Sequence, residues 1–368
     1  MSADAGARGS QAGKSGSAAA PVTSKGKPVA DPKPPHATRR KVEGDTPKET
    51  AAAGAAIRSE VPRSTAGDWS SAADRPDPVA LILEQSAGRA PSLVPIWHGQ
   101  MLASPFTFYR GAATIMATDL AGTPATGLTS QLCGDAHLSN FGSFGTVTRE
   151  QIFDINDFDE TLPGPWEWDL KRLAASAVVA GRGNGFSHKD CRKMALLVAR
   201  AYRQAMAHLA QCNSMDVWYY YHDLSKVQAV FEKYSTKKGR KHVRKVGGKA
   251  RAHTQEQSLA KLTRIEDGRR RINSDPPLLV PFDELQLDQI KSEAVLDQLS
   301  REAALATFEE YLTSLPNDRQ RLLARYKIVD GGLRVGGVGS VGTRCMIVLL
   351  QGDAKDDALI LQLKEAGP

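Results

Sequence analysis

Two short apolar stretches, each running directly into a loop rich in carboxylates, constrain this chain more than any other feature. Thr129 to Cys133 reads as a strand that leads into GDAHLSNFG, and Gln151 to Ile155 reads as a second strand that leads into NDFDE. Loops positioned by buried strands are where binding and catalytic side chains concentrate. We therefore place the candidate functional site between Gly134 and Asp169.

The first loop carries a carboxylate and an amide five residues apart, Asp135 and Asn140. Phosphoryl transfer needs a carboxylate that orients the attacking hydroxyl group and an oxygen ligand for Mg²⁺ close by. Asp135 and Asn140 supply both groups from one turn, so we assign them these roles. His137 lies between them. It is either a second catalytic side chain that touches substrate or a packed residue that supports the loop.

The second loop interleaves acidic side chains with large apolar ones in the sequence FDINDFDET. Acids this close together repel one another unless a cation or hydrogen-bond donors hold them. A solvated acidic turn usually has polar neighbours, which this loop lacks. We favour a metal site that includes Asp157 and Asp159, and the alternative is a set of buried caps and salt bridges.

The order of these pieces resembles the catalytic core of protein-kinase-like folds, especially small-molecule kinases such as aminoglycoside and choline kinases. Cys133 to Asn140 resembles their catalytic loop, although Cys133 stands where they have a histidine. Asn156-Asp157-Phe158 resembles their metal loop, and Gly164 to Leu170 resembles the turn and helix start that follow.

This resemblance implies a role for each matching residue. Asp135 is the catalytic base, Asn140 and Asp157 bind Mg²⁺, and Asp169 braces the loop. Asp157 is preferred to Asp154 because its separation from Asp169 is the one usual in that family.

A glycine-rich segment, Gly337-Val-Gly339-Ser340-Val-Gly342, lies much later in the chain. A dinucleotide-binding fold would need a helix directly after it, whereas the following Cys345 to Leu350 is β-rich. A hairpin whose backbone N–H groups approach phosphates fits better.

A later strand, Ile360 to Ala366, carries one inward lysine, Lys364. This lysine looks like the strand lysine that pairs with nucleotide phosphates. The segment and the lysine together predict a site for ATP or another nucleotide. The alternative is a structural hairpin with a lysine facing water.

The order of the elements is unusual for a kinase. The glycine segment and Lys364 follow the catalytic loop by about 200 residues, whereas ordinary kinases have them before it. Either the fold is circularly permuted or one of the two resemblances is accidental.

Longer sequence segments give a more specific family resemblance. From about residue 77 to the end it is similar to the bacterial domain of unknown function 2252 family, in SPFTFYRGAA, CGDAHLSNFG, FDINDFDETLPGPWEWDLKRLAAS and GVGSVGTRC…LQLKEA. That family has no established reaction. Its members usually continue past LQLKEA, so we expect a truncated member that lacks part of the nucleotide lobe.

Composition divides the chain into three segments. Residues 1–66 are poor in large apolar side chains and hold eleven Lys/Arg against six Asp/Glu, so we expect a disordered basic tail. Residues 67–325 read as a helix-rich region that carries the catalytic loop, with helices at 168–180, 187–210, 303–311 and 318–326. Residues 326–368 read as antiparallel strands. We therefore predict an α+β, kinase-like fold with a helix-rich lobe and C-terminal β hairpins.

Two further features have open interpretations. Arg110 is either a ligand for phosphate or carboxylate or a partner in a structural salt bridge. The basic segment 233–271 lacks interleaved aromatic residues, so we expect a solvated helical excursion, with phosphate steering as the alternative.

Bulk properties narrow the function. No stretch approaches the roughly 20 apolar residues of a bilayer span, and the N-terminus does not resemble a secretory signal. We expect a cytoplasmic protein that contacts neither membrane nor specific nucleic acid. The leading hypothesis is an ATP- and Mg²⁺-dependent phosphotransferase on a small molecule. The alternatives are a pseudokinase-like nucleotide-binding remnant and a metal-dependent phosphoesterase.

Overall fold

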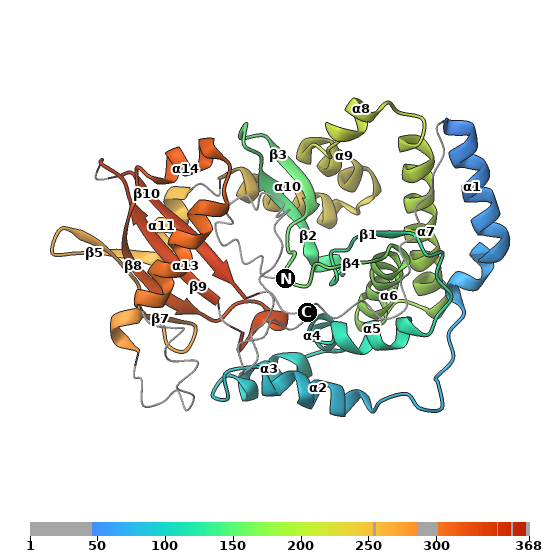
Figure 1. The fold of residues 1–368 in the computed structure, drawn as a ribbon, viewed down its shortest axis with the longest axis horizontal. Coiled ribbons are helices and arrows are strands. Elements are labelled where there is room, and N and C mark those ends of the chain that lie inside the picture. The colour runs from blue at the N-terminus through green and yellow to red at the C-terminus, as the bar shows by residue number, and fades with distance from the viewer. Residues whose placement is uncertain (1–45, 253–254, 286–300, 344, 355, 366–368) are drawn as a thin grey trace.

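The computed structural model describes residues 46–252, 255–285, 301–343, 345–354 and 356–365, which form an α+β fold. Helices from residues 78–234 gather on one side of the molecule, and a four-stranded sheet near the C-terminus, backed by helices, forms the other side (Figure 1). The α+β class with C-terminal antiparallel strands is confirmed.

A helix, α1 (Pro47–Glu60), occupies part of the segment predicted to be disordered. A capping box starts it: the Thr46 hydroxyl accepts from the backbone N of Glu49 at 3.3 Å, and the Glu49 carboxylate accepts from the backbone N of Thr46 at 2.9 Å. The alanine run that follows favours a helix, and Ile57 is buried. The prediction of disorder is therefore corrected for 46–66, and residues 1–45 lie outside the described residues.

Four short helices build a small core: α2 (Pro78–Ala87), α3 (Val94–Leu102), α4 (Pro105–Gly111) and α5 (Ala113–Ala121). A proline in the first turn starts each of the first three. Trp97 and Met101 are almost fully buried and pack with Val338 and Val341 of the glycine-rich segment. This core docks the glycine-rich segment onto the helices.

The strands predicted ahead of the first loop and ahead of the second loop are both present. β1 (Thr129–Gln131) is shorter than expected and pairs with β4 (Pro163–Pro165). β2 (Phe141–Gly145) and β3 (Gln151–Ile155) form an antiparallel hairpin. Because the hairpin returns the chain to its own start, the loop before β2 and the loop after β3 lie together.

Two long helices support this region, α6 (Glu167–Gly183) and α7 (His188–Leu209). Ser187 caps α7 as the sequence predicts, with its hydroxyl accepting from the backbone N of Asp190 at 3.2 Å. α6 buries Arg172 and Ser176.

The basic segment folds as a mixture of helices and a hairpin. It follows α8 (Ser214–Trp218) and α9 (Leu224–Tyr234), and it contains α10 (Lys237–Ala252), α11 (Gln255–Leu262), β5 (Thr263–Glu266) and β6 (Arg269–Ile272). Arg244 of α10 pairs with Glu232 of α9 at 2.8 Å. The helical expectation holds for α10 and α11, and the β5–β6 hairpin was not foreseen.

The four-stranded sheet has the order β10-β9-β8-β7 with every neighbouring pair antiparallel, from β7 (Leu279–Pro281), β8 (Lys327–Arg334), β9 (Cys345–Gln351) and β10 (Ala358–Lys364). The unbroken apolar run of β9 is explained by burial on both faces. Ile347 packs on the same side as Leu259 of α11, and Val348 packs with Phe308 of α13 (Arg301–Ser314), which leads into α14 (Asn317–Leu323). β7 precedes residue 326, so the sheet draws on both segments that composition separated.

Within the part of the chain that the structure describes, no helix combines the length and apolar character needed to span a bilayer.

Candidate active site

The chain turns sharply at Gly134, where the first loop begins. Its φ of +82° lies in the left-handed region, and a Cβ at this position would collide with the backbone carbonyl of Glu160. Glycine is required here for both reasons. The close approach brings the second loop against the first, so the two loops form one site.

Asp135 is buried, and both of its carboxylate oxygens have partners. Nε of Arg172 donates to Oδ1 at 2.6 Å, and Nε2 of His137 lies 3.2 Å from Oδ2. Arg172 is itself held by α4, because its Nη2 donates to the Tyr109 carbonyl at 2.8 Å and its guanidinium lies over the Tyr109 ring. The carboxylate therefore has a fixed orientation and a balancing charge.

Arg172 is the main residue of the site that the sequence analysis missed. Its side chain is 3 % exposed, and an arginine buried this deeply needs a partner. The sequence pattern predicts the helix at 168–180 but gives no partner for a charged residue on it. The usable signal was its position three residues after Asp169, since residues at that spacing share one helix face.

Asn140 and Asp169 hold the first loop by its backbone. Nδ2 of Asn140 donates to the carbonyls of Asp135 at 3.0 Å and Asp157 at 3.1 Å. The Asp169 carboxylate accepts from the backbone N of Cys133 at 2.7 Å and of Gly134 at 3.1 Å. Because all of these Asn140 bonds use its nitrogen, Oδ1 is left outside them as a potential metal ligand.

Cys133 and His137 have the character of packed residues. Burial raises the pKa of the Cys133 thiol to about 12, which keeps it protonated and unreactive. The His137 ring is buried and meets Phe106 edge-on, with ring centroids 6.1 Å apart. The supporting role of His137 is thus the one that this geometry favours, and direct contact with substrate stays a prediction.

Lys364, at the end of β10, lies between the acids of the second loop. Its Nζ donates to Asp157 Oδ1 at 3.0 Å and to Asp159 Oδ2 at 2.8 Å. Burial lowers the pKa of Lys364, but the charges of the two aspartates outweigh burial and raise it. Burial and the neighbouring Asp157 raise the pKa of Asp159 to about 6. Two carboxylates share one lysine, so the group keeps a net negative charge.

The other acids of this loop differ in their surroundings. The Asp154 side chain is exposed and accepts from the adjacent backbone N of Ile155 at 2.7 Å, so it lies outside the site. Glu160 reaches solvent but is surrounded by packed loops. Desolvation there and the charge of Asp135 raise the pKa of its carboxyl group.

The glycine segment lies in the connection between the antiparallel strands β8 and β9, and it contains a short 3-10 turn, η5 (Val338–Ser340). Gly342 follows it with a φ of +86°, and its carbonyl accepts from the backbone N of Ala90 at 2.8 Å. The Arg89 side chain donates to the Val341 carbonyl and lies over the Trp97 ring. The expected hairpin is therefore present as β8 and β9, and the two buried valines between the glycines, Val338 and Val341, hold its turn against the helices.

Arg110 lies at the face of this turn. A Cβ on Gly337 would lie 3.5 Å from Arg110 Nη2, and a Cβ on Gly339 would lie 3.8 Å from Glu160 Oε1. Nε of Arg110 is buried without a hydrogen-bond partner among the described residues. Among the described residues this guanidinium forms no ion pair, so the salt-bridge alternative gains no support. The turn thus meets the acidic loop with a guanidinium beside it.

The donor atoms of the site fit a hard cation. Asn140, Asp157 and Asp159 offer only oxygen ligands, and Mg²⁺ is usually held by one or two carboxylates, with water and phosphate completing its shell. No three His, Cys, Asp or Glu side chains among the described residues could hold a metal ion by themselves. Lys364 Nζ stands between the two aspartates and supplies the positive charge that a cation would add.

Comparisons with known proteins give a family but no reaction. The family model described as "Uncharacterized protein conserved in bacteria (DUF2252)" matches residues 89–368. Comparison with curated proteins found no match, and comparison with solved structures found none. Because the matched region covers well over half of the sequence, the chain belongs to this bacterial family of uncharacterised proteins.

Proposed function

We propose that this chain is a phosphotransferase that uses ATP and Mg²⁺ to phosphorylate a small molecule, with kinase-like elements in circularly permuted order. One observation carries the proposal. Lys364 pairs with Asp157 and Asp159, more than 200 residues earlier, beside the loop that bears Asp135 and Asn140. In kinases a strand lysine, a metal aspartate and the catalytic-loop asparagine meet at the nucleotide.

The roles follow from the contacts. Asp135 orients the acceptor hydroxyl, and Arg172 and His137 hold it in place for this role. Asp169 fixes the backbone at Cys133 and Gly134, so the loop keeps its shape when the acceptor binds.

Asn140, Asp157 and Asp159 would hold Mg²⁺. When bound, the ion neutralises charge that develops on the transferred phosphoryl group. The net negative charge of the aspartate pair beside Lys364 supports this assignment.

Lys364 and Arg110 are the cations suited to the nucleotide phosphates. Arg110 supports this assignment because its Nε is buried without a hydrogen-bond partner among the described residues. A guanidinium group beside a turn without side chains at Gly337 and Gly339 suits an oxyanion. Backbone N–H groups of the turn add donors without steric hindrance.

Nucleotide binding without turnover is a second candidate, favoured by one observation. Both oxygens of Asp135 are engaged, Oδ1 by Arg172 and Oδ2 by His137, so an acceptor hydroxyl would have to compete with these partners for the carboxylate. A pseudokinase-like protein would keep the nucleotide contacts and lack transfer. The phosphoesterase alternative has no comparable support among the described residues.

The direct test is transfer of phosphate from ATP to small hydroxylated or amine-bearing acceptors, followed by mass spectrometry of the products. Asp135→Asn should lower the rate about 10²–10⁴-fold and leave ATP affinity unchanged. Asp154→Asn is the matched control and should keep full activity, because Asp154 is an exposed acid on β3, the strand that leads into the second loop. Product formation at the same rate in Asp135→Asn would refute the assignment, and ATP binding with no product from any acceptor would select the second candidate.

A further inference from the structure

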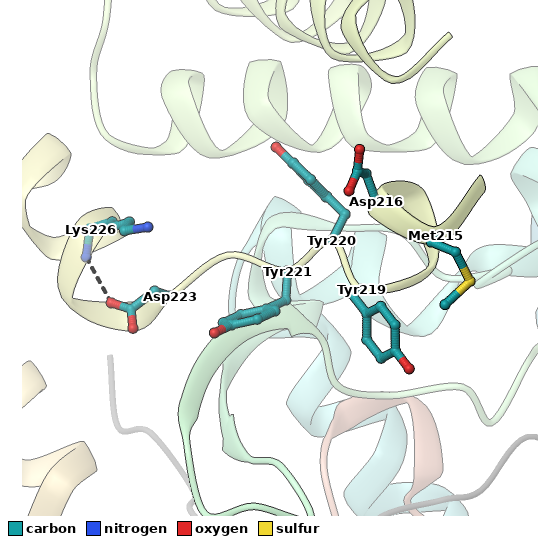
Figure 2. A pocket seen from close by; sticks show the side chains of 7 residues that line it. All are labelled: Met215, Asp216, Tyr219, Tyr220, Tyr221, Asp223 and Lys226. Carbon is teal, nitrogen blue, oxygen red and sulfur yellow. Dashed lines mark hydrogen bonds between the residues drawn. The ribbon is translucent and has the colours of Figure 1, made fainter. Parts of the chain in front are cut away.

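The loop between α8 and α9 lines a cavity of about 460 Å³ that belongs to no part of the proposed nucleotide site. Three consecutive tyrosines and two aspartates dominate its wall, namely Tyr219, Tyr220, Tyr221, Asp216 and Asp223 (Figure 2).

The tyrosines are open to solvent. Tyr219 is 68 % exposed, Tyr220 46 % and Tyr221 47 %. One edge-on contact between the rings of Tyr220 and His222, with centroids 5.2 Å apart, limits how Tyr220 turns. Aromatic faces held in place but uncovered can attract a cation through the negative face of the ring.

The charge in the cavity is suited to a cation. The lining carries two carboxylates, those of Asp216 and Asp223, and one ammonium group, that of Lys226. Asp223 is fixed because it caps α9, with its carboxylate accepting from the backbone N of Ser225 at 2.8 Å and of Lys226 at 3.1 Å. Figure 2 shows Asp216 and Tyr220 pointing to the same side of the loop, at the opposite end from Lys226. That end therefore joins an aromatic face to a carboxylate.

The cavity is also connected to the candidate active site. The backbone N of Phe153 in β3 donates to the His222 carbonyl at 2.8 Å, and Ile152 forms a bridge with Asp223. The loop therefore lies along the strand that ends just before Asp157.

We propose that this cavity binds an organic cation, an ammonium group with apolar substituents. A metal ion would not contact the aromatic rings favourably, and a neutral apolar molecule would leave the carboxylates without a partner. An organic cation can contact both. The proposal goes beyond phosphoryl transfer, because binding here requires neither nucleotide nor turnover.

Calorimetric titration with choline, and with 3,3-dimethylbutan-1-ol as its uncharged analogue of the same shape, tests this proposal. Choline should bind saturably and at least about tenfold more tightly than the alcohol. Tyr220→Leu keeps an apolar side chain but removes the aromatic face, and it should weaken choline binding about tenfold. Asp216→Asn should weaken it as well. Tyr234→Leu removes an exposed tyrosine outside the cavity and should change nothing.

Equal affinity for choline and the alcohol would overturn the proposal, because it would show an apolar site without selection for charge. Absence of saturable choline binding would overturn it too, as would binding that neither Tyr220→Leu nor Asp216→Asn affects. The titration contains no nucleotide, so a failure to bind choline leaves the phosphotransferase proposal standing. Failure of phosphate transfer likewise leaves the proposed cation site standing.

Discussion

Two segments of the candidate active site, the first loop and the glycine-rich turn, are held by different interactions. The loop that begins at Gly134 is fixed by charged hydrogen bonds from Arg172 and Asp169. The turn between Gly337 and Gly342 is fixed by apolar packing of Val338 and Val341 on the helix core. One loop depends on charge balance, and the other depends on shape.

This difference suits the proposed division of labour. A carboxylate that orients a reacting hydroxyl needs a precise and charged surrounding. A turn that presents backbone N–H groups to phosphates needs a fixed course and no side chains in the way. The comparison therefore predicts that the two loops fail in different ways when they are altered.

Removal of Arg172 should have the largest effect. Arg172→Met leaves the buried Asp135 without its cation, and this should lower the free energy of unfolding by about 3–5 kcal/mol in urea titrations. Arg75→Met is the matched control, because Arg75 and Asp119 pair nearer the surface, with side chains 27 % and 19 % exposed, and its loss should destabilise the protein less than Arg172→Met. Equal losses in the two variants would show that the charge of Arg172 does not hold the loop.

Alanine substitutions at Gly134 and Gly342 should have the next largest effect and should destabilise the protein to different extents. Gly134 and Gly342 both have positive φ, so alanine at either position incurs about 1–2 kcal/mol of backbone strain. Gly134→Ala must also displace the Glu160 backbone, whereas Gly342→Ala meets only the Arg89 side chain, 3.1 Å away. Thermal unfolding should show Gly134→Ala to be the more damaging by about 1 kcal/mol or more. The reverse order would contradict the account of the first loop.

The dependence of stability on pH should show the smallest effect. Burial raises the folded pKa of Asp159 from 3.8 to about 6, so its contribution to stability is fully present below the unfolded value. It is lost as pH rises through 6. Asp159→Asn should flatten the stability profile between pH 4 and 6 by at most about 1.4 kcal/mol per pH unit.

Asp154→Asn, with its exposed side chain, should leave the slope of this profile unchanged. Parallel profiles for the wild-type protein and Asp159→Asn would refute the raised pKa of Asp159.

Periodicity and caps predicted much of the fold. The Ser187 cap placed the start of α7, and the apolar run at Cys345 to Leu350 placed β9. The partnership of β7 with β8 was not visible, because pairing between segments far apart depends on the whole sheet. α1 was missed because a single capping box outweighed a composition typical of disorder.

The site was predicted only in part, because local sequence patterns identify single residues but do not show contacts between distant segments. Asp135, Asn140 and Asp157 follow short strands, and local pattern was enough to select them. Arg172 was not selected, because its contact with Asp135 depends on how α6 packs. The pairing of Lys364 with Asp157 and Asp159 was likewise visible only in three dimensions.

The measurement that tests the central claim most directly is a thermal-shift titration with ATP, with and without Mg²⁺. At 100-fold above the dissociation constant, binding should stabilise the protein by about 2.7 kcal/mol. We expect a Mg²⁺-dependent rise in Tm that Asp157→Asn abolishes and Asp154→Asn retains. No rise with any nucleotide, or a rise that Asp157→Asn leaves intact, would contradict the assignment of this site to nucleotide and metal.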